Sequence, residues 1–303
     1  MYRSLEEICK EAAATGCSFW ELIQKDDCRE RQIAQEESFV QLQRMYQAMK
    51  EADQDYDETL HSRSGLVGTD GGKLEHYVEQ EEPICGDFLG RVMEKAVKMG
   101  ESNACMKRIV AAPTAGACGV IPAVFLSYEE YCKETENRMV EALFVSAGIG
   151  AVIAENASIA GASGGCQAEI GSASAMAAGG LAYLQGGDAE CIANAAAFAL
   201  KNMLGLTCDP VCGLVEVPCI KRNSAGAVNA AVSAQMAMAG IKSAIPADEV
   251  IDSMRRIGNA LPAALRETSE GGLAVTESAR KIAERMGKKE HIAKKTRESN
   301  ENQ

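Results

Sequence analysis

Basic charge, aromatic side chains and long apolar runs are all scarce in this 303-residue sequence. Lys plus Arg number 31 against 43 Asp plus Glu, which gives a net charge of −12. Nucleic acids and anionic membranes bind basic surfaces, so the charge balance argues against both as partners. Ordinary solubility is the simpler interpretation of the acidity.

The apolar runs are too short to cross a membrane. The longest, residues 142–154, is bounded by Glu141 and Glu155 and falls well short of the roughly 20 residues that a spanning helix requires, so we expect a buried core helix. The N-terminal residues lack the uninterrupted apolar segment of a secretion signal. Together with twelve cysteines, this predicts a cytoplasmic protein whose thiols stay reduced.

Alanine and glycine are abundant in the middle of the chain, whereas aromatics make up only 5%. Alanine favours helix, and small side chains let helices approach closely. We therefore expect an all-α protein, a mainly helical single large domain with Gly/Pro-rich loops and at most a short hairpin. Residues 1–58 are predicted to be an N-terminal segment of two or three helices packing on the body, residues 59–286 the helical body, and residues 287–303 a disordered polar tail.

Some helix boundaries also follow from the pattern. Gly100 is expected to end a helix that begins near residue 86, because glycine is a poor helix former. Another helix is expected from Ser224 to Ala239. The Val-Glu-Val-Pro segment at 215–218 is short and β-branched, so an extended, hairpin-like loop is expected there.

Four cysteines lie in loops punctuated by glycine and proline, namely Cys166, Cys208, Cys212 and Cys219. Thiolates are soft ligands that suit iron–sulfur clusters, zinc or copper(I), and a loop can aim several sulfurs at one point. A buried cysteine is as often a small hydrophobe. Structural zinc usually shows paired C-x2-C ligands, whereas three residues separate Cys208 from Cys212 and no second pair exists. A non-enzymatic, metal-stabilised interaction protein is therefore the weaker alternative.

Two further loops have the composition of binding sites. The segment H-S-R-S-G-L-V-G-T-D-G-G (61–72) has four glycines, which suits a turn whose backbone amides approach an anion, although a plain surface turn is equally compatible. The segment A-A-P-T-A-G-A-C-G (111–119) precedes an apolar run. It is either a carboxylate cradle at a helix N-terminus or a simple helix cap.

Several polar side chains near these loops have two interpretations each. Glu169 follows Cys166 by three residues, which makes it a candidate acid/base or ammonium partner, or a carboxylate that complements a helix dipole. Asn156 and Ser158 suit either substrate binding or helix capping. Lys221 and its neighbour Arg222 suit either a substrate carboxylate or solvent.

Four segments carry a resemblance to a known family. They are H-S-R-S-G-L-V-G (61–68), A-A-P-T-A-G-A-C-G-V-I-P-A-V (111–124), E-N-A-S-I-A-G-A-S-G-G-C-Q-A-E-I-G (155–171) and G-L-T-C-D-P-V-C-G-L-V-E-V-P-C-I-K-R-N (205–223). In these segments the chain resembles the catalytic alpha subunit of the iron-sulfur-dependent bacterial L-serine dehydratases. The resemblance implies a 4Fe-4S cluster on Cys166, Cys208 and Cys219. Cys212 stands where the family is expected to have glycine, so it is an extra thiol.

The resemblance also implies an activity. L-Serine would be converted to pyruvate and ammonia by β-elimination, with an open iron as Lewis acid, and residues 59–286 would be the catalytic domain. A separate beta subunit is implied, because relatives have either two subunits or a longer single chain. The base would be His61, since histidine as a residue type suits proton transfer near neutral pH, or Glu169, or a group of the beta subunit. The implied substrate-binding residues are Ser64, Gly65, Thr114, Gly116, Asn156, Ser158 and Lys221.

A pyridoxal-phosphate enzyme is the nearest enzymatic alternative. Such an enzyme needs a Schiff-base lysine and a glycine-rich phosphate loop. The segment A-A-G-G-L (177–181) resembles that loop faintly, and the central lysines are few: Lys201, Lys221 and Lys242.

Overall fold

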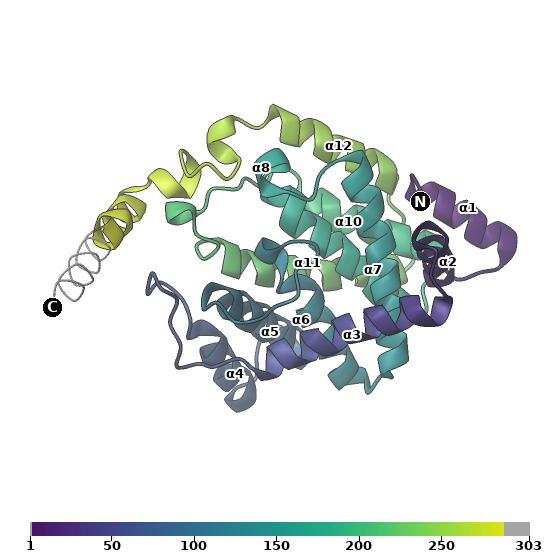
Figure 1. Ribbon diagram of the computed structural model, residues 1–303, viewed down its shortest axis with the longest axis horizontal. Helices are drawn as coiled ribbons and strands as arrows, with labels where there is room; N and C mark the ends of the chain where they lie inside the picture. Colours follow the sequence, from purple (N-terminus) through teal and green to yellow (C-terminus); the bar gives the residue numbers. More distant parts are fainter. Residues whose placement is uncertain (1, 288–303) are drawn as a thin grey trace.

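The computed structural model describes residues 2–287, and within them the chain is helical without a named β-strand. This confirms the predicted all-α class. The helices are α1 (Leu5–Thr15), α2 (Phe19–Arg31), α3 (Gln35–Gln54), α4 (Asp70–Gln80), α5 (Gly86–Ala104), α6 (Val120–Cys132), α7 (Glu136–Asn156), α8 (Gly161–Gly164), α9 (Ser172–Leu184), α10 (Ala189–Met203), α11 (Cys219–Met238) and α12 (Ala247–Ala260). Figure 1 shows them stacked around a central group formed by α7, α10 and α11.

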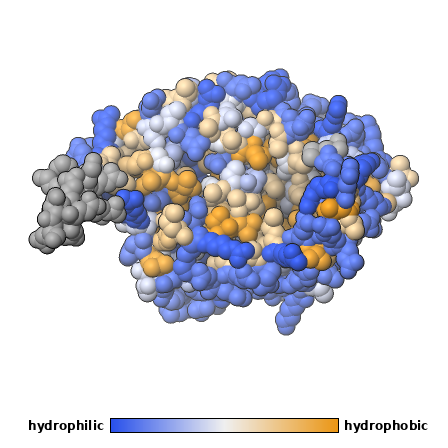
Figure 2. Space-filling model, viewed as in Figure 1, coloured by the Kyte–Doolittle hydropathy of each residue, from blue (hydrophilic) through white to orange (hydrophobic). Residues whose placement is uncertain are grey.

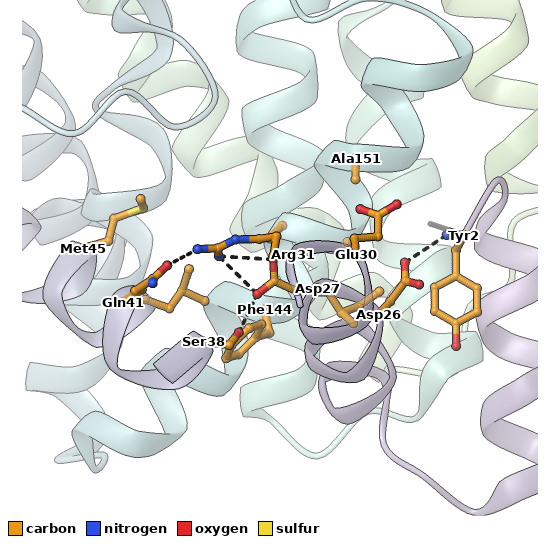
Figure 3. A pocket seen from close by; sticks show the side chains of 14 residues that line it. Tyr2, Asp26, Asp27, Glu30, Arg31, Ser38, Gln41, Met45, Phe144 and Ala151 are labelled. Carbon is orange, nitrogen blue, oxygen red and sulfur yellow. Dashed lines mark hydrogen bonds and ion pairs between the residues drawn. The ribbon is translucent and has the colours of Figure 1, made fainter. Parts of the chain in front are cut away.

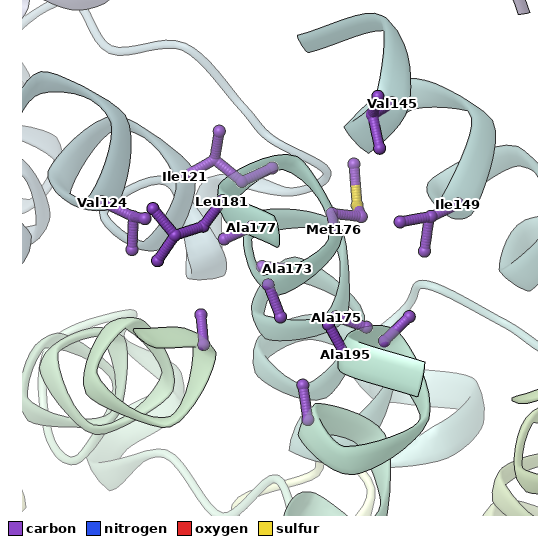
Figure 4. Packing of buried hydrophobic residues seen from close by; sticks show 14 of the residues in the cluster. Ile121, Val124, Val145, Ile149, Ala173, Ala175, Met176, Ala177, Leu181 and Ala195 are labelled. Atoms are coloured by element: carbon purple, nitrogen blue, oxygen red, sulfur yellow. The ribbon is translucent and has the colours of Figure 1, made fainter. Parts of the chain in front are cut away.

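Helix α9 is the centre of the core, because every one of its residues is buried. It packs against α6, α7, α10 and α11. Figure 4 shows how its side chains meet those of its neighbours, Leu181 lying towards Ile121 and Met176 towards Ile149. Its Ala and Gly residues allow this close approach. A Cβ on Gly180, for example, would overlap the ring of Phe125.

Helix α7 is long and apolar enough to cross a membrane by length and composition alone. In the structure 67% of its apolar window is buried. It packs against α9 on one side and against α2 and α3 on another. It is the buried core helix that the sequence predicts.

The N-terminal segment forms three helices, α1 to α3, as its pattern indicates. Helix α2 begins with a capping box in which Ser18 and Glu21 satisfy each other's backbone groups. Its Trp20 lies 6.3 Å from Phe144 of α7, and Phe39 of α3 lies 6.2 Å from the same ring. These aromatic contacts fix the segment on the body, while the division into domains stays a prediction.

Two local expectations are wrong. Gly100 lies inside α5, where the missing side chain makes room for Ile220 at 3.2 Å from an added Cβ. Helix α11 begins at Cys219, five residues before the predicted start. The segment 215–218 is a loop, as expected, and forms no strand. This loop is closed by the N–H of Val211, which donates to the carbonyl of Val217 at 2.9 Å.

The C-terminal part leaves the body along one side. Two short 3-10 turns, Ala263–Leu265 and Gly272–Val275, precede a helical stretch over 277–287 that extends away from the core (Figure 1). Residues 288–303 of the predicted tail lie outside the described part. Figure 2 shows that apolar residues gather across the middle of the same face, within a mostly hydrophilic surface.

Candidate active site

Three buried cysteines reach one region from separate elements. Cys166 follows α8, after Gly165 with its φ of +76°, and directly precedes a π-helical turn at Gln167–Gly171. Such widened turns often occur at functional sites. Cys208 lies in the loop after α10, and Cys219 is the first residue of α11.

The electrostatics of the thiols show that they are neighbours. A hydrogen bond between Cys166 and Cys208 lowers the pKa of Cys166 and raises that of Cys208. Burial, followed by the negative charge of Cys166, raises the pKa of Cys219 to about 12. The structure therefore brings the three predicted ligands together, while their role as ligands stays a prediction.

Thiolates are soft donors of the kind that hold iron–sulfur clusters. Within residues 2–287, no group of three or more His, Cys, Asp or Glu side chains is arranged to hold a single metal ion.

A cation lies beside the thiols. Arg222, on the first turn of α11, places Nη2 at 2.9 Å from Asp209 Oδ1 and donates from Nη1 to the carbonyl of Thr207 at 2.7 Å. Burial opposes its charge, but the negative charges of Cys166 and Asp209 raise the pKa of Arg222 above its ordinary value. In return its positive charge contributes to the low pKa of Cys166. Arg222 therefore offsets negative charge that the thiolates bring into the interior.

The carboxyl group of Glu169 lies in the same region. Thr114 donates a hydrogen bond to its Oε1 at 2.8 Å. A Cβ on Gly161 would stand 2.8 Å from Glu169 Oε2 and 3.1 Å from Cys208 Sγ, so this glycine lies between the carboxyl and a thiol. A Cβ on Gly116 would stand 2.9 Å from Oε1. The two glycines thus leave the space that the carboxyl occupies.

Burial raises the pKa of Glu169, the Thr114 hydrogen bond opposes this, and the charge of Glu267 adds to the rise. A carboxyl whose pKa moves up towards neutrality is a stronger base than an ordinary glutamate. Of the two candidate bases, this one touches the cysteine region. His61 is exposed.

The C-terminal segment holds the Cys208 loop in place. Cys208 N donates to the carbonyl of Leu265 at 2.9 Å, and Glu267 N donates to the carbonyl of Cys208 at 2.7 Å. These bonds make the isolated bridge between Cys208 and Arg266. Asp209 Oδ2 accepts from the N–H of Leu273 at 2.8 Å, which adds a third attachment.

A buried carboxylate of the protein itself binds the backbone N–H groups of the loop at 61–72. Glu101 of α5, fully buried, accepts the N–H groups of Gly68, Asp70 and Gly71 at 2.9 to 3.0 Å, so the anion in this turn is the protein's own. Gly65, with a φ of +78°, makes the turn by donating to the carbonyl of Ser62.

Ser64, in the same loop, is buried and donates to Glu216 Oε2 at 2.5 Å, and Ser62 donates to the same atom at 3.1 Å. Glu216 lies three residues before Cys219, so the loop is attached next to the site. Lys221 is exposed and pairs with Asp70 at 2.5 Å on the α4 side. Assignment of these residues to substrate stays a prediction.

Two other predicted substrate residues are engaged elsewhere. Asn156 Nδ2 donates to the carbonyls of Arg3 and Val152, both at 2.8 Å, which ties the N-terminus to the end of α7. Ser158 Oγ accepts from the N–H of Ala160 at 3.0 Å. Both side chains are bonded to backbone groups, and their assignment to substrate stays a prediction.

The sequence interpretation missed several residues that the site uses. The resemblance names Lys221 and not Arg222 among the substrate-binding residues. Because α11 begins at Cys219, residues 219, 222 and 223 share one helix face, which brings Arg222 to the cysteine region. Glu101 and Glu216 are distant in sequence from the groups they hold, and no local pattern marks them.

A separate hollow of about 230 Å³ lies between α2, α3 and α7 (Figure 3). Three acidic residues line it, but their charges are engaged within the protein. Asp27 accepts from Ser38 at 2.6 Å and pairs with Arg31, which also contacts Gln41. Asp26 accepts from the N–H of Tyr2. This hollow adjoins none of the site cysteines.

Comparison with known proteins gives matches along most of the chain. A sequence profile of the family described as "Serine dehydratase alpha chain" matches residues 14–274. The chain is 43% identical to the probable L-serine dehydratase, alpha chain, of Bacillus subtilis (strain 168), over 94% of this chain and 95% of the relative.

Two further relatives differ in how much of their length is matched. The L-serine dehydratase, alpha chain, of Peptoniphilus asaccharolyticus is 37% identical over 92% of this chain and 95% of its own. The L-serine dehydratase TdcG of Escherichia coli (strain K12) is 47% identical over 182 residues, which are 59% of this chain and 40% of the relative.

Proposed function

The chain belongs to the serine dehydratase alpha chain family, and on that premise we propose that it is the catalytic subunit of an L-serine dehydratase, a lyase that converts L-serine to pyruvate and ammonia. The observation that carries the proposal is the meeting of Cys166, Cys208 and Cys219 with a basic carboxyl, Glu169.

The donor set fits the 4Fe-4S cluster on which the family depends. Cys166, Cys208 and Cys219 would hold it, Arg222 would offset part of its negative charge, and Gly161 leaves room beside Cys208 Sγ. With three protein ligands for four irons, such a cluster supplies a Lewis acid for the substrate hydroxyl when it is bound.

Glu169 has the position and basicity to take the α-proton of serine. Its Oε1 is fixed by Thr114, whereas Oε2 is the oxygen nearest to Gly161 and hence to the Cys208 side. We assign the proton acceptor to Oε2. Loss of the α-proton and of the β-hydroxyl as water leaves aminoacrylate, which tautomerises to an imine and hydrolyses to pyruvate and ammonia.

Arg222 and Thr114 have separate tasks near the site. Arg222 already contacts Asp209, Thr207 and Cys166, so its role is to neutralise charge and hold the loop. The hydroxyl of Thr114 keeps the carboxyl of Glu169 in one orientation. A base that is already oriented needs no rearrangement before it takes the proton.

The pyridoxal-phosphate alternative finds no support in the described residues. Residues 177–181 are buried inside α9 and form no loop. Lys201 donates to Ser243 at 2.8 Å, Lys221 pairs with Asp70, and Lys242 pairs with Glu190. All three lysines are therefore engaged with other side chains.

We further propose a separate beta subunit and a cytoplasmic location. The relatives that match along nearly their whole length carry the name alpha chain, whereas the E. coli protein has a long part without a counterpart here. The twelve cysteines are all free, which suits a reducing compartment.

The decisive experiment is anaerobic reconstitution with iron and sulfide, followed by a pyruvate assay with L-serine, with and without a beta subunit. We expect a yellow-brown protein that turns over serine and loses both properties in air. Changing Cys166, Cys208 or Cys219 to Ser should abolish iron retention, and Cys212→Ser should not. Stoichiometric zinc without pyruvate formation in the reconstituted complex would refute the proposal.

A further inference from the structure

Asn223 joins two parts of the site that are distant in sequence. It is buried to 2% exposure and lies one turn after Cys219 on α11. Its Nδ2 donates to the carbonyl of Cys219 at 3.0 Å and to the carbonyl of Gly116 at 2.8 Å. Its Oδ1 accepts from the N–H of Gly119 at 2.8 Å. Both amide protons and one lone pair are therefore used on backbone groups.

The loop at 114–119 is thereby held from two sides. A Cβ on Gly119 would stand 3.1 Å from Asn223 Oδ1, and a Cβ on Gly116 would stand 2.9 Å from Glu169 Oε1. Thr114, at the start of the loop, donates to Glu169. One side of the loop thus contacts the base, and the other contacts the amide that touches Cys219.

We propose that Asn223 is a positioning residue that sets the distance between Cys219 and the Thr114–Glu169 pair. The proposal rests on the proposed function for its catalytic meaning. The base must stand at a fixed distance from the α-proton of the bound substrate, and a displacement of about 1 Å at such a site can cost about 10²-fold in rate. Asn223 fixes this distance because its bonds run from α11 directly to the loop that carries Thr114.

The first test needs neither metal nor substrate. Asn223→Ala removes all three bonds, so amide hydrogen exchange over 114–119 and alkylation of Cys219 should each accelerate at least about tenfold in the purified chain. Asn223→Asp keeps an acceptor for Gly119 N–H but loses both donors. It should leave loop exchange near that of the unchanged protein while Cys219 alkylation rises.

The matched control is Asn229 on the same helix. Its Nδ2 donates to Ser174 Oγ at 2.8 Å and to the carbonyl of Ala199 at 3.0 Å, so it has a comparable network that does not reach the site. Asn229→Ala and Asn229→Asp should leave loop exchange and Cys219 alkylation unchanged. Equal effects of the Asn223 and Asn229 changes, or unchanged loop exchange in Asn223→Ala with an intact circular dichroism spectrum, would overturn the proposal.

The second test is a double-mutant cycle on the reconstituted complex. Asn223→Ala should lower kcat by about 10²-fold with a smaller change in KM, and adding Thr114→Val should cost little more, because both act on the position of Glu169. If the fold-losses in kcat of the two single variants instead multiply in the double variant, the two residues do not share a role. If the unchanged complex does not turn over serine, the proposed function fails, and the exchange and alkylation data still decide whether Asn223 holds the loop at 114–119. Should Asn223→Ala not fold, Asn223→Asp replaces it in the alkylation test, where unchanged alkylation of Cys219 would overturn the proposal.

Discussion

Glu101 Oε2 accepts the backbone N–H of Gly71 at 2.9 Å, which places a buried carboxylate at the N-terminus of α4. The other oxygen takes the N–H groups of Gly68 and Asp70, and the hydroxyl of Tyr56 donates to Oε2. A helix N-terminus carries partial positive charge, so these donors and the helix dipole stabilise the carboxylate.

Glu101→Gln should therefore loosen the loop at 61–72. The side-chain amide of the new Gln would place an N–H donor against backbone N–H groups, which are themselves donors. Because this leaves buried donors without an acceptor, we expect a loss of about 2–3 kcal/mol in the free energy of unfolding. Trypsin cleavage after the exposed Arg63 should accelerate. Glu94→Gln is the control, because Glu94 is buried on the same helix but pairs with Lys98 at 2.8 Å and with Arg91 at 3.1 Å, and does not hold the N–H groups that Glu101 accepts. Cleavage at Arg63 should not respond to it.

Glu169→Gln should lower kcat by about 10²- to 10⁴-fold, since a general base contributes that much and the amide cannot take a proton. The Thr114 hydrogen bond can persist, because Gln retains the accepting oxygen. His61→Asn should leave kcat within a few-fold, since His61 is exposed. Steady-state kinetics on the reconstituted complex distinguish the two bases. The reverse pattern would assign the base to His61.

Cys212→Gly should stabilise the loop without loss of iron. Cys212 has φ of +58°, a left-handed conformation that favours glycine. Glycine removes that strain but has a larger conformational entropy in the unfolded chain, which offsets part of the gain. The net effect should be a rise of about 0.5–1 kcal/mol in the free energy of unfolding, measured by denaturant titration. Iron loss in this variant would instead make Cys212 a ligand.

The capping box of α2 predicts a stability effect that depends on pH. Hydrogen bonds from the backbone and side chain of Ser18 lower the pKa of Glu21. A carboxyl with a lowered folded pKa contributes stability above its unfolded pKa, and that contribution is lost as the pH falls through the folded pKa. Glu21→Gln should lower the melting temperature at neutral pH, and the difference should shrink in acid. A difference independent of pH would contradict this.

The helical class and the buried α7 follow from composition and pattern alone. The amphipathic residues of 4–53 also indicate two or three helices, and the structure has three. The pattern does not predict the start of α11. Pro218, Cys219 and the charged Lys221 and Arg222 look like a continuation of the preceding loop. With the helix start placed five residues too late, the pattern does not show that Cys219 and Arg222 share a helix face.

The candidate site is predictable only in part. Cys166, Cys208 and Cys219 are marked by Gly and Pro around them and by the family resemblance, and Glu169 by its spacing from Cys166. Asn223 and Glu101 hold backbone groups 30 to more than 100 residues away. Such contacts depend on the packed fold, so no local pattern reveals them.

The complete burial of α9 limits how this enzyme can respond to a bound molecule. Its N-terminal end follows directly from the π-helical turn that bears Glu169, and tight packing leaves the helix no room to shift or rotate. The backbone of Glu169 thus belongs to the rigid frame of the molecule, and only its side chain depends on Thr114 for its orientation. Any induced fit would come from segments outside this frame, such as 61–72 and 205–218.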